Sequence, residues 1–237
     1  MNDIQFQREE LLIGKENLLK LHNAKVAIYG IGGVGSYVCE ALARAGIGSF
    51  LLVDFDRIDI TNLNRQIHAT YKTVGEYKVD AMKERILEIN PDAQVNTVKE
   101  IPEEEKEEDF IDSSFDYIVD AVDTVSTKLK LILKSDKEKV PIISSMGTGN
   151  KLDPTQFKVS SIKKTKVCPL AKVIRKELKD QKIEKLKVVY SEEEPIKTNN
   201  ENNVKRVPGS ISFVPSTAGL IIAGEVIKDI IRKTSNF

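Results

Sequence analysis

Cysteine is scarce in this chain, and there is no excess of either charge. Two cysteines, Cys39 and Cys168, occur in 237 residues. This count excludes a disulfide framework and a four-cysteine zinc site within one chain, and it fits a reducing compartment. The 36 basic and 36 acidic side chains cancel. Net charge therefore does not mark the whole molecule as a nucleic-acid binder, whereas a local basic patch stays compatible with one.

Long apolar runs are missing as well. No stretch approaches the length that a helix needs to cross a bilayer. Residues 1–5 lack the basic and apolar regions of a signal peptide. Hydrophobic residues make up 41% of the chain and charged residues 30%, which is typical of a globular protein with a sizeable core. We therefore expect a cytoplasmic protein with no membrane segment.

The G-x-x-x-x-G-K-[S/T] phosphate loop is absent, which excludes the standard kinases and ATPases. A different glycine pattern follows the apolar run 25–29, which we predict to be a buried strand. It precedes residues 36–45, whose apolar side chains recur at helical spacing. Glycines let the backbone approach a phosphate, and the amides that open a helix favour an anion. This context predicts a nucleotide-binding turn that contains Gly30, Gly32, Gly33 and Gly35.

Strands and helices alternate along the chain up to residue 150. Further strands are expected at 49–53, 94–98, 116–120 and 140–144, with helices near 75–90 and 129–139. This order predicts an α/β fold, a Rossmann-like, doubly wound, mostly parallel sheet with helices on both faces. Beyond it we expect an antiparallel α+β extension, with strands at 157–162, 186–190 and 211–214 and helices at 170–182 and 216–233.

These elements predict a single domain over residues 1–237. A helical lead-in (1–24) precedes the nucleotide-binding core (25–150), and a substrate-facing C-terminal part (151–237) follows. In the lead-in, leucines form an apolar face that Gly14 interrupts. The helix 216–233 carries charged residues inside its apolar pattern, which favours a core or dimer-interface helix over a membrane span.

Polar residues gather where the predicted strands end, and ligands bind at the carboxyl ends of parallel strands. Asp54 follows the second strand, about twenty residues after the glycines, where a nucleotide fold holds a ribose hydroxyl. Asp123 follows the fourth strand, and a glycine-containing loop, 147–150, follows the fifth. Together with the glycine turn, four loops are expected to converge on one crevice.

Glycines and a ribose-binding acid fit two classes of enzyme, a nicotinamide-dependent dehydrogenase and an enzyme that uses ATP. A triphosphate needs cations besides backbone amides. Arg65 can clamp phosphate oxygens, Lys78 adds a point charge, and Asp123 can hold a magnesium ion that bridges phosphates. The set favours adenylation, in which a carboxylate attacks the α-phosphorus and pyrophosphate leaves. Such a step depends on positioning and charge neutralisation.

Three blocks resemble the E1-like superfamily, the ubiquitin-activating enzymes and their bacterial relatives that adenylate a carboxylate. The blocks are G-I-G-G-V-G (30–35), D-F-D-x-x-x-x-T-N-L-N-R-Q (54–66) and G-x-x-K (75–78). The resemblance implies a homodimer in which Arg8 reaches the partner's ATP site. It implies catalytic roles for Arg65, Lys78 and Asp123, the last through magnesium. The implied ATP-binding residues are Arg8, Gly30, Gly32, Gly33, Gly35, Asp54, Asp56, Asn62, Arg65, Gln66 and Lys78.

Four more motifs resemble the tRNA threonylcarbamoyladenosine dehydratase branch of that superfamily: N-R-Q-I-H-A (64–69), S-M-G-x-G-N-K-L-D-P (145–154), C-P-L-A-K (168–172) and K-R-V-P-G-S-I-S-F-V-P-S (205–216). The implied substrate is N6-threonylcarbamoyladenosine at position 37 of tRNA. ATP activates its threonyl carboxylate, and an atom of the carbamoyl group closes a ring, with net loss of water. The resemblance implies ATP, Mg²⁺ and a monovalent cation (Na⁺ or K⁺), and it leaves room for a sulfurtransferase-type protein partner.

A tRNA substrate requires a basic surface. Phosphate contacts of this kind position RNA without reading its sequence, although any single lysine here also fits an ordinary solvated helix face. The candidate residues lie in two clusters, Lys163, Lys164, Lys166, Lys172, Arg175 and Lys176 in one, and Lys205 with Arg206 in the other.

Alternatives remain open at this point. The chain lacks the two C-x-x-C pairs of many sulfur-carrier enzymes, which favours the dehydratase branch. Cys39 is expected in the core; Cys168 is an ordinary thiol or, alternatively, a thioester or sulfur-transfer residue. We favour a structural or substrate-loop role for His68 over a general base.

Competing functions are an adenylating enzyme for a ubiquitin-like or sulfur-carrier protein, a NAD-binding oxidoreductase and a nucleotide-gated interaction module.

Overall fold

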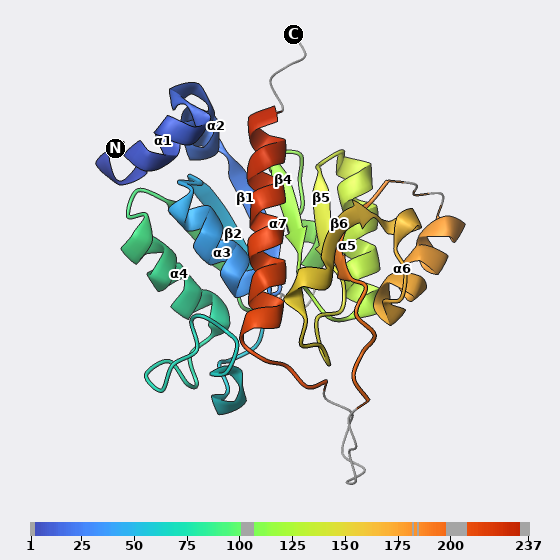
Figure 1. Ribbon diagram of the computed structural model, residues 1–237. Coiled ribbons are helices and arrows are strands. Elements are labelled where there is room, and N and C mark those ends of the chain that lie inside the picture. Colours follow the sequence, from blue (N-terminus) through green and yellow to red (C-terminus); the bar gives the residue numbers. More distant parts are fainter. Residues whose placement is uncertain (1–2, 101–106, 182, 184, 198–207, 233–237) are drawn as a thin grey trace.

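The computed structural model describes residues 3–100, 107–181, 183, 185–197 and 208–232 (Figure 1). Its centre is a seven-stranded sheet in the order β3-β2-β1-β4-β5-β7-β6. Every neighbouring pair is parallel except β6 and β7, which are antiparallel. The strands are β1 (Lys25–Tyr29), β2 (Ser49–Val53), β3 (Gln94–Val98), β4 (Tyr117–Asp120), β5 (Ile142–Ser145), β6 (Phe157–Ser161) and β7 (Lys187–Ser191). The predicted Rossmann-like sheet with an antiparallel extension is confirmed.

Helices cover both faces of this sheet because its strands are apolar on both sides. In β1, Val26 and Ile28 pack into the cluster formed with α3, α4 and α7, whereas Ala27 and Tyr29 belong to a cluster on the opposite face with Leu131 of α5. Figure 1 shows α7 running across the front of the sheet. The covering helices are α3 (Gly35–Arg44), α4 (Lys78–Ile89), α5 (Val125–Glu138), α6 (Pro169–Asp180) and α7 (Phe213–Arg232).

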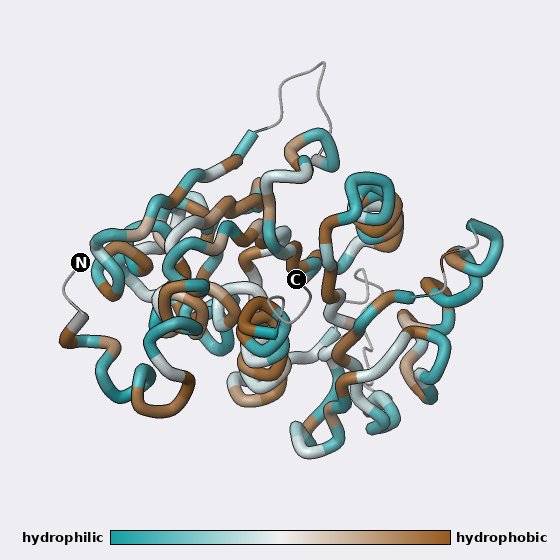
Figure 2. Tube along the Cα trace, turned by 90° about the horizontal axis from the view of Figure 1, so that it is seen from above, coloured by the Kyte–Doolittle hydropathy of each residue, from teal (hydrophilic) through white to brown (hydrophobic). Residues whose placement is uncertain are grey.

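Figure 2 shows apolar stretches on the inner strands and on one side of the surrounding helices, with polar stretches turned outward. This pattern is the amphipathic signal that predicted the helices. None of the helices in the described ranges has the length and apolarity that crossing a bilayer requires.

The helical lead-in divides at Gly14, whose φ of +81° suits glycine, into α1 (Gln7–Ile13) and α2 (Lys15–Asn23). Its apolar face is buried only in α2, where Leu18 and Leu21 contribute to the core. In α1, Leu11 and Leu12 are 88% and 85% exposed. None of the described residues therefore covers the leucines of α1.

The predicted strand at 211–214 is wrong, because α7 already begins at Phe213. The run Ile211–Val214 contains β-branched and aromatic residues, and over so few residues this composition does not separate a strand from a buried helix. Pro215 is compatible with the helix because it lies in the first turn, where backbone N–H groups have no intrahelical partner. Among the described residues, no strand follows β7 in the sequence, and β6 forms the edge of the sheet next to β7.

The contact between α3 and α7 depends on Gly219. A Cβ atom built there would lie 2.5 Å from the carbonyl oxygen of Val34 and 2.9 Å from the Cβ of Tyr37. Both distances are shorter than van der Waals contact. The glycine therefore lets α7 approach the helix that starts at the glycine turn.

We predict opposite effects for two glycine-to-alanine substitutions in α7. Gly219→Ala lowers the free energy of unfolding by about 1–3 kcal/mol because it forces α7 away from α3. Gly224→Ala raises it by about 0.5–1 kcal/mol, because alanine favours the helix and no atom lies within 4 Å of the added Cβ. Urea unfolding of both variants measures the difference. Equal effects would contradict the close contact.

Candidate active site at the carboxyl ends of the strands

A cavity of about 920 Å³ opens at the carboxyl edge of the parallel strands. The loops after β1, β2, β4 and β5 all line it, through residues that include Gly30, Asp54, Asp123 and Gly147. The four loops expected to converge therefore meet at one cavity. A second cavity, of about 670 Å³, lies around the amino ends of β4, β5 and β7, and none of the predicted site residues lines it.

The glycine turn forms the floor of the larger cavity. Gly30 has a φ of +85°, and a Cβ atom there would lie 2.7 Å from the carbonyl oxygen of Ala121. A Cβ atom at Gly35 would lie 1.8 Å from the carbonyl oxygen of Gly30. These two glycines allow the tight turn and the close approach of the β4 loop. Gly32 and Gly33 line the cavity, where the absence of side chains exposes backbone.

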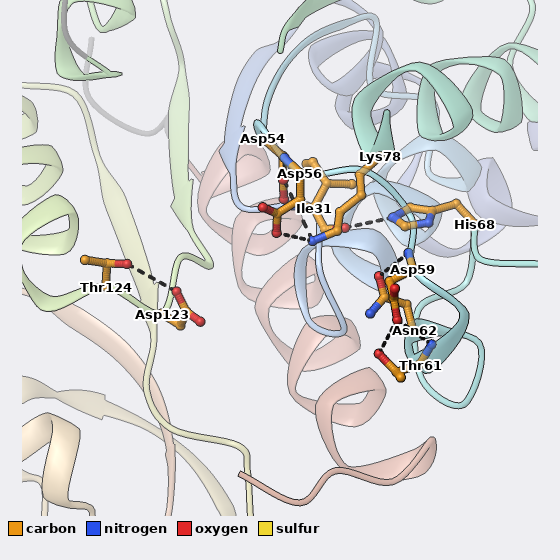
Figure 3. A network of polar contacts seen from close by, with 10 residues as sticks. All are labelled: Ile31, Asp54, Asp56, Asp59, Thr61, Asn62, His68, Lys78, Asp123 and Thr124. Atoms are coloured by element: carbon orange, nitrogen blue, oxygen red, sulfur yellow. Dashed lines mark hydrogen bonds and ion pairs between the residues drawn. The ribbon is translucent and has the colours of Figure 1, made fainter. Parts of the chain in front are cut away.

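Asp54 links the end of β2 to the glycine turn (Figure 3). Its Oδ2 accepts a hydrogen bond of 2.6 Å from the backbone N–H of Ile31, and its Oδ1 accepts one of 2.9 Å from that of Asp56. Burial raises the pKa of this carboxyl group, and the charge of Lys78 opposes that rise. Asp54 thus holds the turn in place and still lines the cavity.

Lys78 opens α4 and is only 6% exposed. Its ammonium group lies 2.6 Å from a carboxylate oxygen of Asp56 and 3.9 Å from one of Asp54. The Asp56 side chain is 73% exposed, so it can turn into solvent when another anion pairs with Lys78. The cavity therefore contains a buried cation whose nearest counter-ion is replaceable.

A short 3₁₀ helix, η2 (Ile60–Asn62), presents the amides of the next loop. The Asp59 side chain accepts from the N–H of Thr61, and the side-chain oxygen of Asn62 accepts from the N–H of Asp59, which closes a capping box. This arrangement fixes Asn62 at the cavity wall and leaves its amide NH₂ group for a ligand.

Arg65 and Gln66 follow η2 and also line the cavity. The Arg65 guanidinium donates to the carbonyl of Thr61 over 2.8 Å and to Asn64 over 3.0 Å, which leaves donors of its fork for a ligand. Gln66 is 5% exposed, and its Oε1 has no hydrogen-bond partner in the described part of the chain. A buried, unsatisfied polar atom at a cavity wall is expected where a ligand or water completes the site.

Asp123 lies on the opposite side of the cavity from Asp54 and Lys78 (Figure 3). It is exposed, and its Oδ1 accepts a hydrogen bond from the Thr124 hydroxyl. Within the described ranges, no three His, Cys, Asp or Glu side chains are grouped to hold a metal ion. A single carboxylate fits Mg²⁺, which takes one or two protein ligands together with phosphates and water.

His68 supports the turn from behind. Its Nε2–H donates over 2.8 Å to the carbonyl of Ile31, and its Nδ1 has no partner among the described residues. Burial lowers its pKa to about 4, so the ring is neutral near pH 7. His68 does not line the cavity. This placement favours the structural role over a general base.

Asn150 makes contacts that its motif did not predict. Its φ of +57° is uncommon for a residue other than glycine. Its Oδ1 accepts from the N–H of Gly209, and its carbonyl accepts from the N–H of Ile196. Asn64 adds a bond to the carbonyl of Ser210. Four segments that are distant in the sequence are thus joined beside the cavity. Apart from the preference of asparagine for positive φ, no local sequence signal could reveal this.

The remaining predicted residues lie away from the cavity wall. Arg8 is exposed on α1. Lys163, Lys164, Lys166, Lys172 and Lys176 are exposed around the start of α6, whereas the Arg175 guanidinium is engaged with the carbonyl and hydroxyl of Thr165. Lys205 and Arg206 lie outside the described residues.

Both cysteines are buried. Cys39 lies in the core, and burial raises the pKa of its thiol. Cys168 precedes α6 and packs in the cluster between α5 and α6, beneath the loop that contains Gly147. Neither thiol is presented to the cavity.

A sequence model of the ThiF family matches residues 6–237 of this chain. The chain belongs to the ThiF family. It is 47% identical over 241 residues to the tRNA threonylcarbamoyladenosine dehydratase of Bacillus subtilis, a match that covers 96% of this chain and 95% of the relative.

Solved structures agree with this membership. The E. coli tRNA N6-threonylcarbamoyladenosine dehydratase in complex with AMP has a TM-score of 0.87 and 32% identity, covering 99% of this chain and 97% of the other. The same enzyme in complex with ATP has a TM-score of 0.86 and 32% identity, covering 98% and 96%. The ThiF-family fold of the present chain is therefore shared along its whole length with enzymes solved with nucleotides.

We predict that His68 makes the stability of this ThiF-family protein depend on pH. The unfolded chain binds a proton on this ring near pH 6.5, but the folded protein only near pH 4. The contribution of the neutral ring to the free energy of unfolding is therefore complete above pH 6.5. As the pH falls toward 4, protons bind preferentially to the unfolded chain, and about 3 kcal/mol of stability is lost. His68→Gln keeps a donor for the Ile31 carbonyl without this titration. Urea unfolding at pH 7 and pH 4.5 should show a smaller pH effect in the variant. The same pH effect in both proteins would contradict the burial of a neutral ring.

Proposed function

We propose that this protein is an ATP-dependent enzyme that dehydrates N6-threonylcarbamoyladenosine at position 37 of tRNA to its cyclic derivative. The observation that carries the proposal is the cavity itself. It combines a glycine turn with a buried lysine, two arginines and aspartates on opposite sides, in a chain whose full-length relatives carry this activity in their names. A triphosphate site explains the cations better than a dinucleotide site does.

We assign a role to each predicted site residue that lines the cavity. Asp54 accepts hydrogen bonds from the ribose, and the glycine turn lets the phosphates lie against backbone amides. Asn62, Arg65, Gln66 and Lys78 contact the phosphates. Asp56 turns away as the triphosphate replaces it beside Lys78. Asp123 is the protein ligand of Mg²⁺, which neutralises phosphate charge when it is bound.

The reaction has two steps. An oxygen of the threonyl carboxylate attacks the α-phosphorus of ATP, the bond to the β-phosphate breaks, and pyrophosphate leaves. An atom of the carbamoyl group then attacks the activated carbonyl carbon, loses its proton and expels AMP. The product lacks one water relative to the starting nucleoside. Arg65 and Lys78 stabilise the charge that develops on the phosphates in the first step.

The C-terminal part carries the substrate side of the site. Its residues Pro208 and Ser210 line the cavity, with Pro208 packed against Gly149 in the last loop of the core. We assign nucleotide binding to the core (25–150) and substrate binding to residues 151–237 within one domain. The monovalent cation and a sulfurtransferase-type partner stay proposals that rest on the family resemblance. A cytoplasmic location follows from the tRNA substrate.

One assay tests this function against its competitors. The purified protein receives ATP, Mg²⁺ and tRNA that contains N6-threonylcarbamoyladenosine, and the digested nucleosides are analysed by mass spectrometry. We expect loss of one water from that nucleoside, and no product with Lys78→Met; Lys137→Met, exposed on α5, is the matched control. Pyrophosphate exchange that requires a carrier-protein tail, or binding of NADH without nucleoside conversion, would refute the proposal.

We also propose a homodimer that completes the site. Arg8 is exposed on α1 beside the exposed Leu11 and Leu12. A groove of about 540 Å³ beside α1, lined by Glu9, Ile67 and Leu220 among others, leads toward the loop that bears Gln66. A second copy that covers these apolar residues would bring its own Arg8 toward this cavity.

Mixing two inactive variants tests the contribution of Arg8 across the interface. Arg8→Ala and Lys78→Met are each expected to be inactive. In a hybrid dimer, the cavity of the Arg8→Ala chain receives an intact Arg8 from the other chain. Random exchange of subunits should restore about a quarter of the wild-type activity, because half the dimers are hybrids with one complete site. No restoration in a mixture with demonstrated exchange would contradict the shared site.

The tRNA surface is proposed at the start of α6, where exposed lysines surround η5 (Ile162–Lys164). Arg175 helps to hold this turn through the bonds of one guanidinium nitrogen to Thr165, and its remaining N–H donors can contact RNA. Lys205 and Arg206 supply the second basic segment.

Charge reversal tests this surface. Lys163→Glu, Lys164→Glu and Lys166→Glu together should weaken tRNA binding and make the negative slope of log K against log salt shallower by about 2, because three phosphate contacts are lost. Filter binding at several salt concentrations measures the slope. Lys137→Glu, at the far end of α5, is the control. An unchanged slope in the triple variant would exclude this surface.

A further inference from the structure

A buried ion pair lies directly behind the loop that bears Asp123. Lys128 of α5, Asp120 at the end of β4 and Ser144 of β5 are all fully buried. The Lys128 ammonium donates to both carboxylate oxygens of Asp120 over 3.0 Å and to the Ser144 hydroxyl oxygen over 3.3 Å. The Ser144 hydroxyl donates to Asp120. One carboxylate thus joins two strands and a helix.

Stability alone does not account for this pair. Removing two charges from water costs as much as their attraction returns, and well-packed apolar residues of similar volume serve a core equally well or better. The two preceding residues of β4, Ile118 and Val119, are apolar and fully buried. The charged pair therefore interrupts an apolar interior at the strand end that faces the cavity.

The contacts of Asp120 continue into the cavity wall. Its Oδ1 also accepts a hydrogen bond of 3.2 Å from the backbone N–H of Val122, one residue before Asp123. Lys128 donates its own backbone N–H to the carbonyl of Thr124, the capping residue just before α5. On its other side, the loop touches Gly30, where a Cβ atom would meet Ala121 and Val122. Residues 121–124 all line the cavity.

We propose that Lys128, through Asp120, positions the loop 121–124 so that Asp123 faces the phosphates with its magnesium ion. Lys128 does not line the cavity, so it acts as a positioning residue rather than a catalytic one. This inference rests on the proposed function, because it assigns Mg²⁺ to Asp123. Supporting residues behind a metal ligand commonly change metal affinity by about 10- to 100-fold when they are replaced.

Lys128→Met tests the inference with a readout separate from catalysis. Binding of a fluorescent ATP analogue is measured first in EDTA and then with increasing Mg²⁺. We expect unchanged affinity in EDTA. The Mg²⁺ concentration that gives half of the maximal effect on binding, here called the Mg²⁺ requirement, should rise by about tenfold. Asp120→Asn/Lys128→Met should return the requirement to within a few-fold of wild type, because the amide oxygen still accepts from Val122 and no buried charge is left unpaired.

Ser135→Ala is the matched control, because this buried serine of α5 bonds only to the carbonyl of Val140 among the contacts described for its side chain. It should lower the melting temperature without moving the Mg²⁺ requirement. Should Lys128→Met fail to fold, the double variant and Ser144→Ala provide the comparison, with a raised requirement expected in Ser144→Ala alone. An unchanged requirement in Lys128→Met, or an equal shift in Ser135→Ala, overturns the inference. A wild-type protein that binds ATP without any Mg²⁺ effect refutes the proposed role of Asp123 itself.

Discussion

The backbone after β1 touches the backbone after β4, and the cavity depends on that contact. A single Cβ atom at Gly30 would come within 2.7 Å of the Ala121 carbonyl oxygen, so a larger residue would push the two loops apart. Asp54 holds the same turn from β2 through the Ile31 amide, and His68 holds it through the Ile31 carbonyl. The phosphates of the proposed ATP ligand would therefore meet backbone amides that are already oriented, which lowers the cost of ordering the site on binding.

The charged side chains of the site are arranged around this glycine turn. Lys78 is buried beside two carboxylates, and a buried ammonium group must keep a counter-ion. The exposed Asp56 supplies one without closing the site. The proposed ATP phosphates would replace it, whereas Asp54 stays bound to the turn. The proposed exchange would let the protein favour a highly charged ligand over a dinucleotide. The proposed magnesium ligand, Asp123, lies across the cavity from Asp54 and Lys78.

Much of this arrangement could be predicted because it is local in the sequence. Buried strands, the glycine turn and the acids at strand ends follow one another at short spacing, so their periodicity and order carry the information. The start of α7 was mispredicted because Ile211–Val214 is too short and too apolar to distinguish strand from helix. Leu11 and Leu12 belong to the apolar face expected for the lead-in, although nothing among the described residues covers them. The contact of Asn150 with Gly209 depends on how distant segments pack, and that of Lys128 with Asp120 on how α5 packs against the end of β4. No pattern within either segment encodes such contacts.

Transfer of oxygen from the nucleoside to AMP tests the central claim most directly. The substrate is tRNA whose N6-threonylcarbamoyladenosine carries ¹⁸O in both oxygens of the threonyl carboxylate, and the products of a reaction with ATP are analysed by mass spectrometry. Adenylation predicts one ¹⁸O atom in each AMP, because the attacking oxygen stays with the α-phosphorus when the ring closes. Formation of ADP with the label in inorganic phosphate, or unlabelled AMP beside a dehydrated nucleoside, would contradict the account.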